Sequence, residues 1–262
     1  MKAMVDGQLH STQNASLEPA DATGVFETLL LRSGAALFFE EHFQRYSAGC
    51  RHFALTGAPD RAVLLDAADT LIRANGITEG VLRWSAWQST TSGAHWTMRV
   101  EHPRSHTLKP IWSAMFAPTR LPPPDSGAAF KHLSRRIWRD ALLQSRGQGF
   151  DEVLLQDING QVVEGAVSNV FFVTQGILRT PALASGPLPG ITRAKVIGLA
   201  GELGLSLDEG VVSPADLRSS QEIFLTNSLA GIRPISTLES TILPAPGPVT
   251  LRLQTAWRAR YG

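Results

Sequence analysis

Apolar and polar positions alternate in short blocks along most of this chain, and turn residues separate the blocks. Alternating or continuous apolar runs predict strands at residues 24–31, 35–39, 80–87, 96–101, 153–155, 161–163, 170–173, 204–212 and 222–226. Apolar residues three and four positions apart predict helices at residues 41–54, 61–75, 134–147, 192–203, 214–217 and 249–261. Strands and helices mixed in this order indicate an α+β or α/β fold.

The clearest boundary in this pattern is a proline-rich stretch. Residues 117–127 contain three successive prolines, which favour an extended and stiff connection over a helix or a strand. We therefore predict a smaller N-terminal α/β domain at residues 1–117, a linker at residues 118–127 and a larger C-terminal domain at residues 128–262. Ligand pockets often form where two domains meet, so a site is expected at their interface.

Composition narrows the class of protein. A chain of 262 residues that is 43% hydrophobic is long enough for a substantial core, and its net charge of +1 gives no support for a nucleic acid or a membrane surface as partner. A single cysteine, Cys50, excludes an intrachain disulfide and fits a protein of a reducing compartment. Its side chain is expected to be buried in the protein as a small hydrophobic group. No signal peptide or spanning segment is visible, so the predicted location is the cytoplasm.

One carboxylate stands among apolar residues. Asn159 and Gly160 form the turn pair that a tight hairpin favours, and Glu164 follows the second strand of that hairpin in a small and polar stretch. Burying Glu164 there is costly unless a cationic group meets it, and a protonated pyridine nitrogen would serve. The pattern equally allows a solvent-exposed glutamate beside a bulge.

The start of the helix predicted at residues 192–203 is a second candidate. Gly190 would allow close approach of a ligand, the first amides of the helix would be free, and Thr192 offers a hydroxyl. Such a helix start is typical of a phosphate site. Threonine also caps many helices that bind no ligand.

The chain is poor in lysine, so few residues are available as a reactive amine. Lys2 lies near a terminus that is expected to be loose, Lys109 precedes a proline in an extended stretch, and Lys195 lies on a helix where a solvated lysine is ordinary. The fourth lysine, Lys131, remains as a candidate. Taken by itself, any single lysine is more often solvated than catalytic.

Six short motifs follow one another over about residues 20–240. They are residues 24–29 (GVFETL), 41–45 (EHFQR), 131–135 (KHLSR), 164–165 (EG) with 168–171 (SNVF), 188–193 (LPGITR) and 226–229 (TNSL). Together they resemble the class IV aminotransferases, the fold-type IV family of pyridoxal phosphate enzymes. The resemblance implies two domains with the cofactor at their interface, in a homodimer.

The resemblance also implies roles for individual residues. Lys131 would form the Schiff base with pyridoxal 5'-phosphate and, once released, move a proton as general base and acid. Glu164 would keep the pyridine nitrogen protonated, and Leu188 would pack on the ring. The remaining implied cofactor-binding residues are Arg45, Ile191, Thr192 and Ser228 at the phosphate, with Asn169, Gly190 and Asn227 elsewhere in the set.

Within the family, residues 224–235 (FLTNSLAGIRPI) and the compact length resemble aminodeoxychorismate lyase. We therefore predict a lyase that converts 4-amino-4-deoxychorismate to 4-aminobenzoate and pyruvate in folate precursor synthesis. The alternative is a transaminase of branched-chain amino acids, D-amino acids or amines. A noncatalytic binding relative is the third possibility, which the intact Lys131 and Glu164 positions disfavour.

Candidate substrate residues are fewer. Phe26 stands where D-amino acid aminotransferases tend to have tyrosine, and residues 93–95 (GAH) lack their Arg-x-His carboxylate trap, which counts against a D-specific enzyme. Arg83 or Arg104 is a candidate for binding a substrate carboxylate, although a surface ion pair is the more ordinary role for each. No metal site is predicted.

Overall fold

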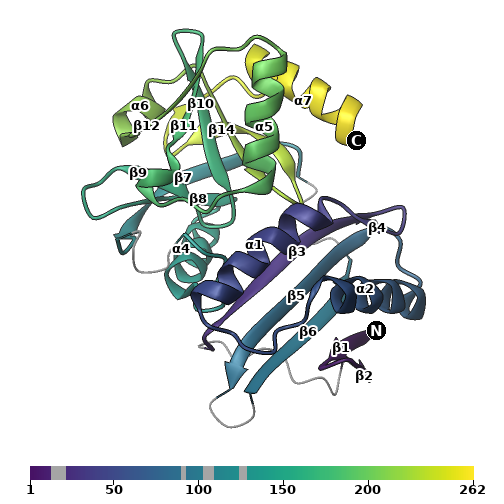
Figure 1. The fold of residues 1–262 in the computed structure, drawn as a ribbon. Coiled ribbons are helices and arrows are strands. Elements are labelled where there is room, and N and C mark those ends of the chain that lie inside the picture. Colours follow the sequence, from purple (N-terminus) through teal and green to yellow (C-terminus); the bar gives the residue numbers. More distant parts are fainter. Residues whose placement is uncertain (13–21, 90–92, 103–108, 124–128) are drawn as a thin grey trace. The chain divides into compact units, whose positions relative to one another are not determined.

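The structure is a computed structural model of the chain, and it describes residues 1–12, 22–89, 93–102, 109–123 and 129–262 (Figure 1). The chain forms two compact units. The first contains Met1–Arg104 and Phe130–Ser134, and the second contains Ser105–Ala129 and Arg135–Gly262. Both units combine sheets with helices, which confirms the predicted mixed fold class.

The first unit is an antiparallel sheet with helices packed on it. Among the described residues the sheet has six strands in the order β2-β1-β6-β5-β3-β4. Figure 1 shows α1 lying along β3, and the core between helices and sheet contains Leu29, Leu64 and Trp84. The elements are β1 Lys2–Val5, β2 Gln8–Ser11, β3 Gly24–Arg32, β4 Ala35–Ala36, α1 Phe39–His52, α2 Arg61–Asn75, β5 Gly80–Ser89 and β6 Gly93–Glu101.

Local sequence signals account for most of this unit. Helix α2 begins and ends at the predicted residues, because the Asp60 side chain accepts from the third amide of the helix and Gly76 takes the left-handed conformation after its last residue. Helix α1 begins two residues earlier than predicted, at Phe39. The predicted return strand at residues 35–39 is correspondingly shorter, because only Ala35–Ala36 pairs with β3.

The second unit is built on a mixed sheet. In the described part of the chain nine strands take part, in the order β12-β11-β10-β13-β14-β7-β8-β9, with β15 paired to β14. Helices α5 and α7 pack on β10 and β13, while α4 packs on β7 and β8. The elements are β7 Trp112–Arg120, α4 Arg136–Gly147, β8 Glu152–Gln156, β9 Val162–Gly165, β10 Asn169–Thr174, β11 Ile177–Pro181, η2 Leu183–Ser185, α5 Ile191–Glu202, β12 Leu207–Gly210, α6 Pro214–Arg218, β13 Glu222–Asn227, β14 Gly231–Leu238, β15 Thr241–Ile242 and α7 Pro248–Tyr261.

The division into units differs from the predicted domain limits at two places. Strand β7 runs through the predicted start of the linker at residue 118 and pairs in parallel with β8 and β14. Phe130–Ser134, predicted to open the C-terminal domain, belongs to the first unit. There the Phe26 N–H donates to the Lys131 carbonyl at 2.9 Å. Linker residues 124–127 lie outside the described residues.

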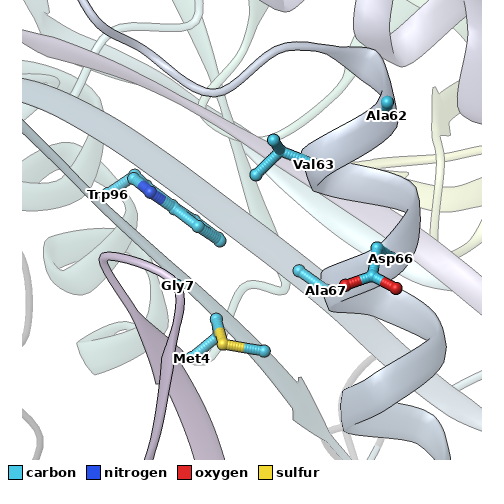
Figure 2. Close-up of a pocket in the computed structure, with 7 residues that line it drawn as sticks. All are labelled: Met4, Gly7, Ala62, Val63, Asp66, Ala67 and Trp96. Atoms are coloured by element: carbon cyan, nitrogen blue, oxygen red, sulfur yellow. The ribbon is translucent and has the colours of Figure 1, made fainter.

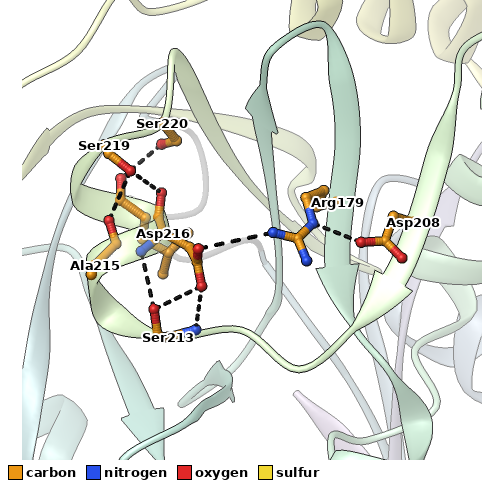
Figure 3. Close-up of polar contacts among 8 residues, drawn as sticks. Arg179, Asp208, Ser213, Ala215, Asp216, Ser219 and Ser220 are labelled. Atoms are coloured by element: carbon orange, nitrogen blue, oxygen red, sulfur yellow. Dashed lines mark hydrogen bonds and ion pairs between the residues drawn. The ribbon is translucent and has the colours of Figure 1, made fainter.

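A polar network fixes one edge of the second sheet (Figure 3). Arg179 on β11 donates to Asp208 on the parallel neighbour β12 at 2.7 Å, and its guanidinium lies 3.9 Å from Asp216 of α6. Ser213 and Asp216 form a reciprocal capping box at the start of α6. The hydrogen bonds from Ser213 hold the pKa of Asp216 below its usual value. These contacts attach α6 to the sheet, and no predicted site residue takes part in them.

Candidate active site

In the first unit, two predicted site residues, Lys131 and Arg83, lie at the ring of a third, Phe26. Backbone hydrogen bonds hold the segment that carries Lys131 along β3. The Lys131 Nζ atom lies 4.5 Å from the centroid of the Phe26 ring, and the guanidinium carbon of Arg83 lies 3.9 Å from the same centroid. Cations are attracted to the face of an aromatic ring, so Phe26 holds both side chains. An amine and a guanidinium thus both lie at the ring of Phe26.

Arg45, the predicted phosphate ligand on α1, is held by a buried carboxylate that the sequence analysis missed. Arg45 donates to Glu27 through Nε and through Nη2, both at 2.7 Å, and His42 Nδ1 lies 2.6 Å from the same carboxylate. Glu27 and His42 are fully buried. The spacing of His42 and Arg45, one helical turn apart, was the available sequence signal.

The charges in this cluster follow from burial and pairing. Burial alone would raise the pKa of Glu27, but the charge of Arg45 and the hydrogen bonds from Arg45 and His42 outweigh it and hold this pKa far below its usual value. An ionised carboxylate only accepts, so His42 donates from Nδ1. Burial lowers the pKa of His42 although Glu27 opposes the shift. Arg45 is thus positioned by an anion.

In the second unit, Glu164 on β9 is 2% exposed, so the solvent-exposed alternative is wrong. Its Oε1 atom accepts from Arg135 Nη2 at 2.6 Å and from Trp138 Nε1 at 2.8 Å. Its Oε2 atom accepts from the Leu188 amide at 2.9 Å. The cationic partner expected from the cost of burial is therefore Arg135 within the chain itself. A carboxylate oxygen has two lone pairs, so Oε2 retains capacity for a further donor.

The residues around the start of α5 also come together. Asn169 Nδ2 donates to the Leu188 carbonyl at 2.9 Å. A Cβ atom at Gly190 would lie 1.9 Å from Asn169 Oδ1, so this position requires glycine. Helix α5 begins at Ile191, one residue before the predicted start, and its first amides have no partners within the helix. The amides of Ile191 and Thr192 therefore remain suited to an anion.

Two buried hydroxyls, one at this helix start and one on β13, indicate a ligand. Thr192 Oγ1 and Thr226 Oγ1 are buried and have no hydrogen-bond partner within the described part of the chain. Thr226 pairs directly with Asn169 across β13 and β10, so their side chains share one face of the sheet. Buried polar atoms are normally satisfied, so a bound group with acceptor atoms fits here.

The two other predicted residues of the second unit lie at the end of β13. Asn227 Oδ1 accepts from the amides of Leu229 at 3.0 Å and Ala230 at 2.7 Å, so this oxygen shapes the turn after the strand. Ser228 is the first residue of that turn, and its role at the phosphate stays a prediction. Arg104, the second candidate for a substrate carboxylate, lies outside the described residues.

A surface pocket of the first unit is separate from all these residues (Figure 2). Apolar side chains of β1, α2 and β6 line it, among them Met4, Val63 and Trp96, together with the carboxylate of Asp66. No predicted site residue lines it. Among the residues that the structure describes, no group of three or more His, Cys, Asp or Glu side chains is placed to hold a metal ion. Within the same residues, no helix is long and apolar enough to span a membrane.

The chain belongs to the amino-transferase class IV family, whose pattern it matches over residues 24–238. It is 28% identical to the branched-chain-amino-acid aminotransferase of Salmonella typhimurium over 90% of this chain and 83% of that protein. It is 24% identical to the D-alanine aminotransferase of Bacillus licheniformis, over 98% of this chain and 95% of that protein.

Solved structures share the fold. The branched-chain aminotransferase of Thermoproteus uzoniensis, determined with norvaline, superposes with a TM-score of 0.90 at 26% identity, over 98% of this chain and 93% of that one. A Legionella pneumophila protein proposed to be 4-amino-4-deoxychorismate lyase superposes with a TM-score of 0.86 at 21% identity, over 95% of this chain and 96% of that one. At that identity the second likeness shows the fold alone.

Pyridoxal 5'-phosphate fits the chemistry of the residues in each unit. In the second unit, the free amides of α5 and the unsatisfied hydroxyls of Thr192 and Thr226 suit a phosphate. The remaining acceptor capacity of Glu164 suits a protonated ring nitrogen. In the first unit, the side chain of Lys131 carries an amine, the type of group that forms a Schiff base with the cofactor aldehyde.

Proposed function

We propose that this protein is a pyridoxal phosphate-dependent aminotransferase that acts on amino acids. The observation that carries the proposal is the placement of the Lys131 amine and the Arg83 guanidinium on the ring of Phe26. An amino acid presents a carboxylate, which the Arg83 guanidinium suits, and an amine, which would take the place of the Lys131 amine on the cofactor aldehyde. The family membership and the relative from Salmonella typhimurium support transamination as the reaction.

Each site residue has a defined task in this proposal. Pyridoxal phosphate, when bound, supplies the electron sink for the reaction. Lys131 is the covalent attachment point, and its Nζ atom then moves the proton at the substrate α-carbon. Glu164 holds the proton on the ring nitrogen, and Leu188 packs on the ring. The amides of Ile191 and Thr192 bind the phosphate.

Arg45 and Ser228 complete the phosphate set that we propose. Arg45 uses Nε and Nη2 for Glu27, which fixes the plane of its guanidinium before any ligand arrives. A guanidinium held in this way loses little freedom on binding an anion. Asn169 and Gly190 contribute by fixing the backbone around Leu188.

Substrate recognition is assigned to Arg83 and Phe26. Arg83 would bind the substrate carboxylate as a bidentate donor. Phe26 would contact the side chain of the substrate and hold the Arg83 guanidinium in place. Branched-chain amino acids are the first class to test, because relatives that cover nearly the whole chain bear that name. We also keep the predicted homodimer as part of the proposal, to be tested by light scattering of the purified protein.

The lyase predicted from residues 224–235 is the less supported reaction. A solved structure named for that activity shares only the fold with this chain, and full-length relatives are named as aminotransferases. Lyase and transaminase use the same cofactor residues. A substrate panel therefore has to separate them.

The experiment uses the full-length protein saturated with pyridoxal phosphate. Branched-chain L-amino acids, D-alanine and aminodeoxychorismate are offered separately, the amino acids with 2-oxoglutarate as amino acceptor. Formation of glutamate from a branched-chain amino acid is expected. Formation of 4-aminobenzoate from aminodeoxychorismate, with no glutamate from any amino acid, would establish the lyase instead.

A lysine exchange tests the attachment point. Borohydride reduction followed by peptide mass spectrometry should find the cofactor on Lys131, and Lys131→Ala should remove both this adduct and glutamate formation. Lys109→Ala is the matched control, because Lys109 pairs with Asp151 at 2.6 Å and has no proposed role. A reducible linkage that persists in Lys131→Ala would overturn the assignment.

A further inference from the structure

Glu152, at the start of β8, is a fully buried carboxylate that the proposed chemistry does not use. Its Oε1 atom accepts from the amides of Val153 at 2.9 Å and Ala166 at 3.1 Å. Its Oε2 atom accepts from the Val167 amide at 3.2 Å and from Ser168 Oγ at 2.8 Å. Three of these four donors belong to residues 166–168, the turn between β9 and β10.

The carboxylate fills the inside of this turn. The Gly165 amide donates to the Ser168 carbonyl at 2.7 Å, which closes the turn. A Cβ atom at Gly165 would lie 2.2 Å from Ser168 Oγ and 3.1 Å from a carboxyl oxygen of Glu152. The turn is therefore wrapped closely around Glu152 and takes its shape from it.

Glu164 and Asn169, which lie on the two sides of the turn, both form hydrogen bonds with the backbone of Leu188. Glu164, which only Gly165 separates from the turn, accepts from the Leu188 amide at 2.9 Å. Asn169, immediately after the turn, donates to the Leu188 carbonyl at 2.9 Å. A change in the shape of the turn would therefore move both partners of the Leu188 backbone at once.

We infer that Glu152 is a positioning residue for the cofactor: it fixes the turn so that Glu164 and Asn169 hold their places. The inference rests on the proposed roles of Glu164 and Leu188. Glu152 touches neither cofactor nor substrate, and it acts through the backbone of residues 165–168. Its loss should therefore weaken cofactor binding in addition to lowering stability.

Glu222 offers a matched control for a purely structural glutamate. It is also buried in the second unit, and it accepts from the amides of Val249 at 2.9 Å and Thr250 at 2.8 Å and from Thr250 Oγ1 at 2.7 Å. These bonds cap helix α7, which carries no proposed cofactor residue. Glu152 and Glu222 are thus both buried, and both accept from backbone amides and one hydroxyl. They differ in the segment that they fix, which is the turn at residues 166–168 for Glu152 and the start of helix α7 for Glu222.

The experiment compares Glu152→Gln with Glu222→Gln in the full-length chain. Each protein is freed of cofactor, its urea unfolding midpoint is measured, and pyridoxal phosphate binding is titrated by tryptophan fluorescence. The Nε2 group of a glutamine donates and cannot accept, so in each variant the donors at one of the two carboxylate oxygens lose their acceptor and both variants should lose stability. Glu152→Gln should also weaken cofactor binding by about tenfold, whereas Glu222→Gln should stay within about twofold of wild type.

Two further variants keep the test decisive. Ser168→Ala removes one donor and leaves the carboxylate, so it should weaken binding in the same direction by about threefold even if Glu152→Gln fails to fold. In a Glu164→Gln background, Glu152→Gln should weaken binding less than it does alone, because it acts through Glu164.

The outcomes separate this inference from the proposed function. Equal cofactor affinity of wild type, Glu152→Gln and Ser168→Ala would overturn the positioning role and leave the proposed function intact. Additive effects of Glu152→Gln and Glu164→Gln would also overturn it. A wild-type protein that binds no pyridoxal phosphate would overturn the proposed function and this inference together.

Discussion

Two carboxylates, one in each unit, are fully buried, and the cost of removing each from water is offset by different kinds of partner. Glu27 in the first unit meets the guanidinium of Arg45 and the imidazole of His42. Glu152 in the second unit accepts from three backbone amides and a serine hydroxyl, all of them uncharged. A charged guanidinium meets the first carboxylate, whereas only uncharged dipoles meet the second.

The difference decides the direction of each pKa shift. Burial disfavours the charged form of both carboxyl groups. For Glu27, the charge of Arg45 and the hydrogen bonds overcome burial, and the pKa falls. For Glu152, burial outweighs the four hydrogen bonds, and the pKa rises. Glu27 is therefore a fixed anion that holds Arg45, whereas Glu152 shapes a turn through dipoles.

The largest expected effect comes from removing the charge of Glu27. Glu27→Gln leaves the guanidinium of Arg45 nearly buried beside a neutral amide, so the free energy of unfolding should fall by about 3–5 kcal/mol. Urea unfolding of the cofactor-free protein measures this. Glu40→Gln is the control, because its pair with Arg61 is exposed. A loss no larger than in that control would show that Glu27 is not a fixed anion.

The pH dependence of stability should have opposite sign for the two carboxylates. The pKa of Glu27 is lowered from its usual 4.5, so its stabilising contribution is present above pH 4.5 and is lost as the pH falls further. The pKa of Glu152 is raised from the same value, so its contribution is present below pH 4.5 and is lost as the pH rises through the raised value.

Unfolding of both variants at pH values on each side of 4.5 checks these signs. The stability deficit of Glu27→Gln should grow as the pH rises from acid to neutral, and the deficit of Glu152→Gln should shrink. Deficits that change in the same direction would contradict the comparison.

The last prediction concerns the reactivity of the Cys50 thiol and involves no expected change in stability. Burial raises the pKa of Cys50 to about 11. Because only the thiolate reacts, Cys50 should react about a hundredfold more slowly with a disulfide reagent in the folded protein than in urea. Equal rates would show that burial does not control this group.

Sequence patterns predicted the elements that local signals define. The hairpin at Asn159 and Gly160 and helix α2 appear where turn and capping residues place them. Helix α5 begins within one residue of its predicted start, without a side-chain cap. Strand β7 was missed, because a proline-rich stretch follows it and its parallel partners β8 and β14 come later in the chain. The motif residues were found, but Thr226 and the anchor Glu27 were not recognised as contributors.

The sequence by itself determined the family, the local elements and the chemical types at the site. Only the tertiary structure decided which distant residues pair: Lys131 with the Phe26 strand, Arg45 with Glu27, and Glu164 with Arg135 and Leu188. The physical reason is that periodicity, turn signals and caps act over a few residues. Strand pairing and the desolvation of buried charges depend on contacts between segments far apart in the chain.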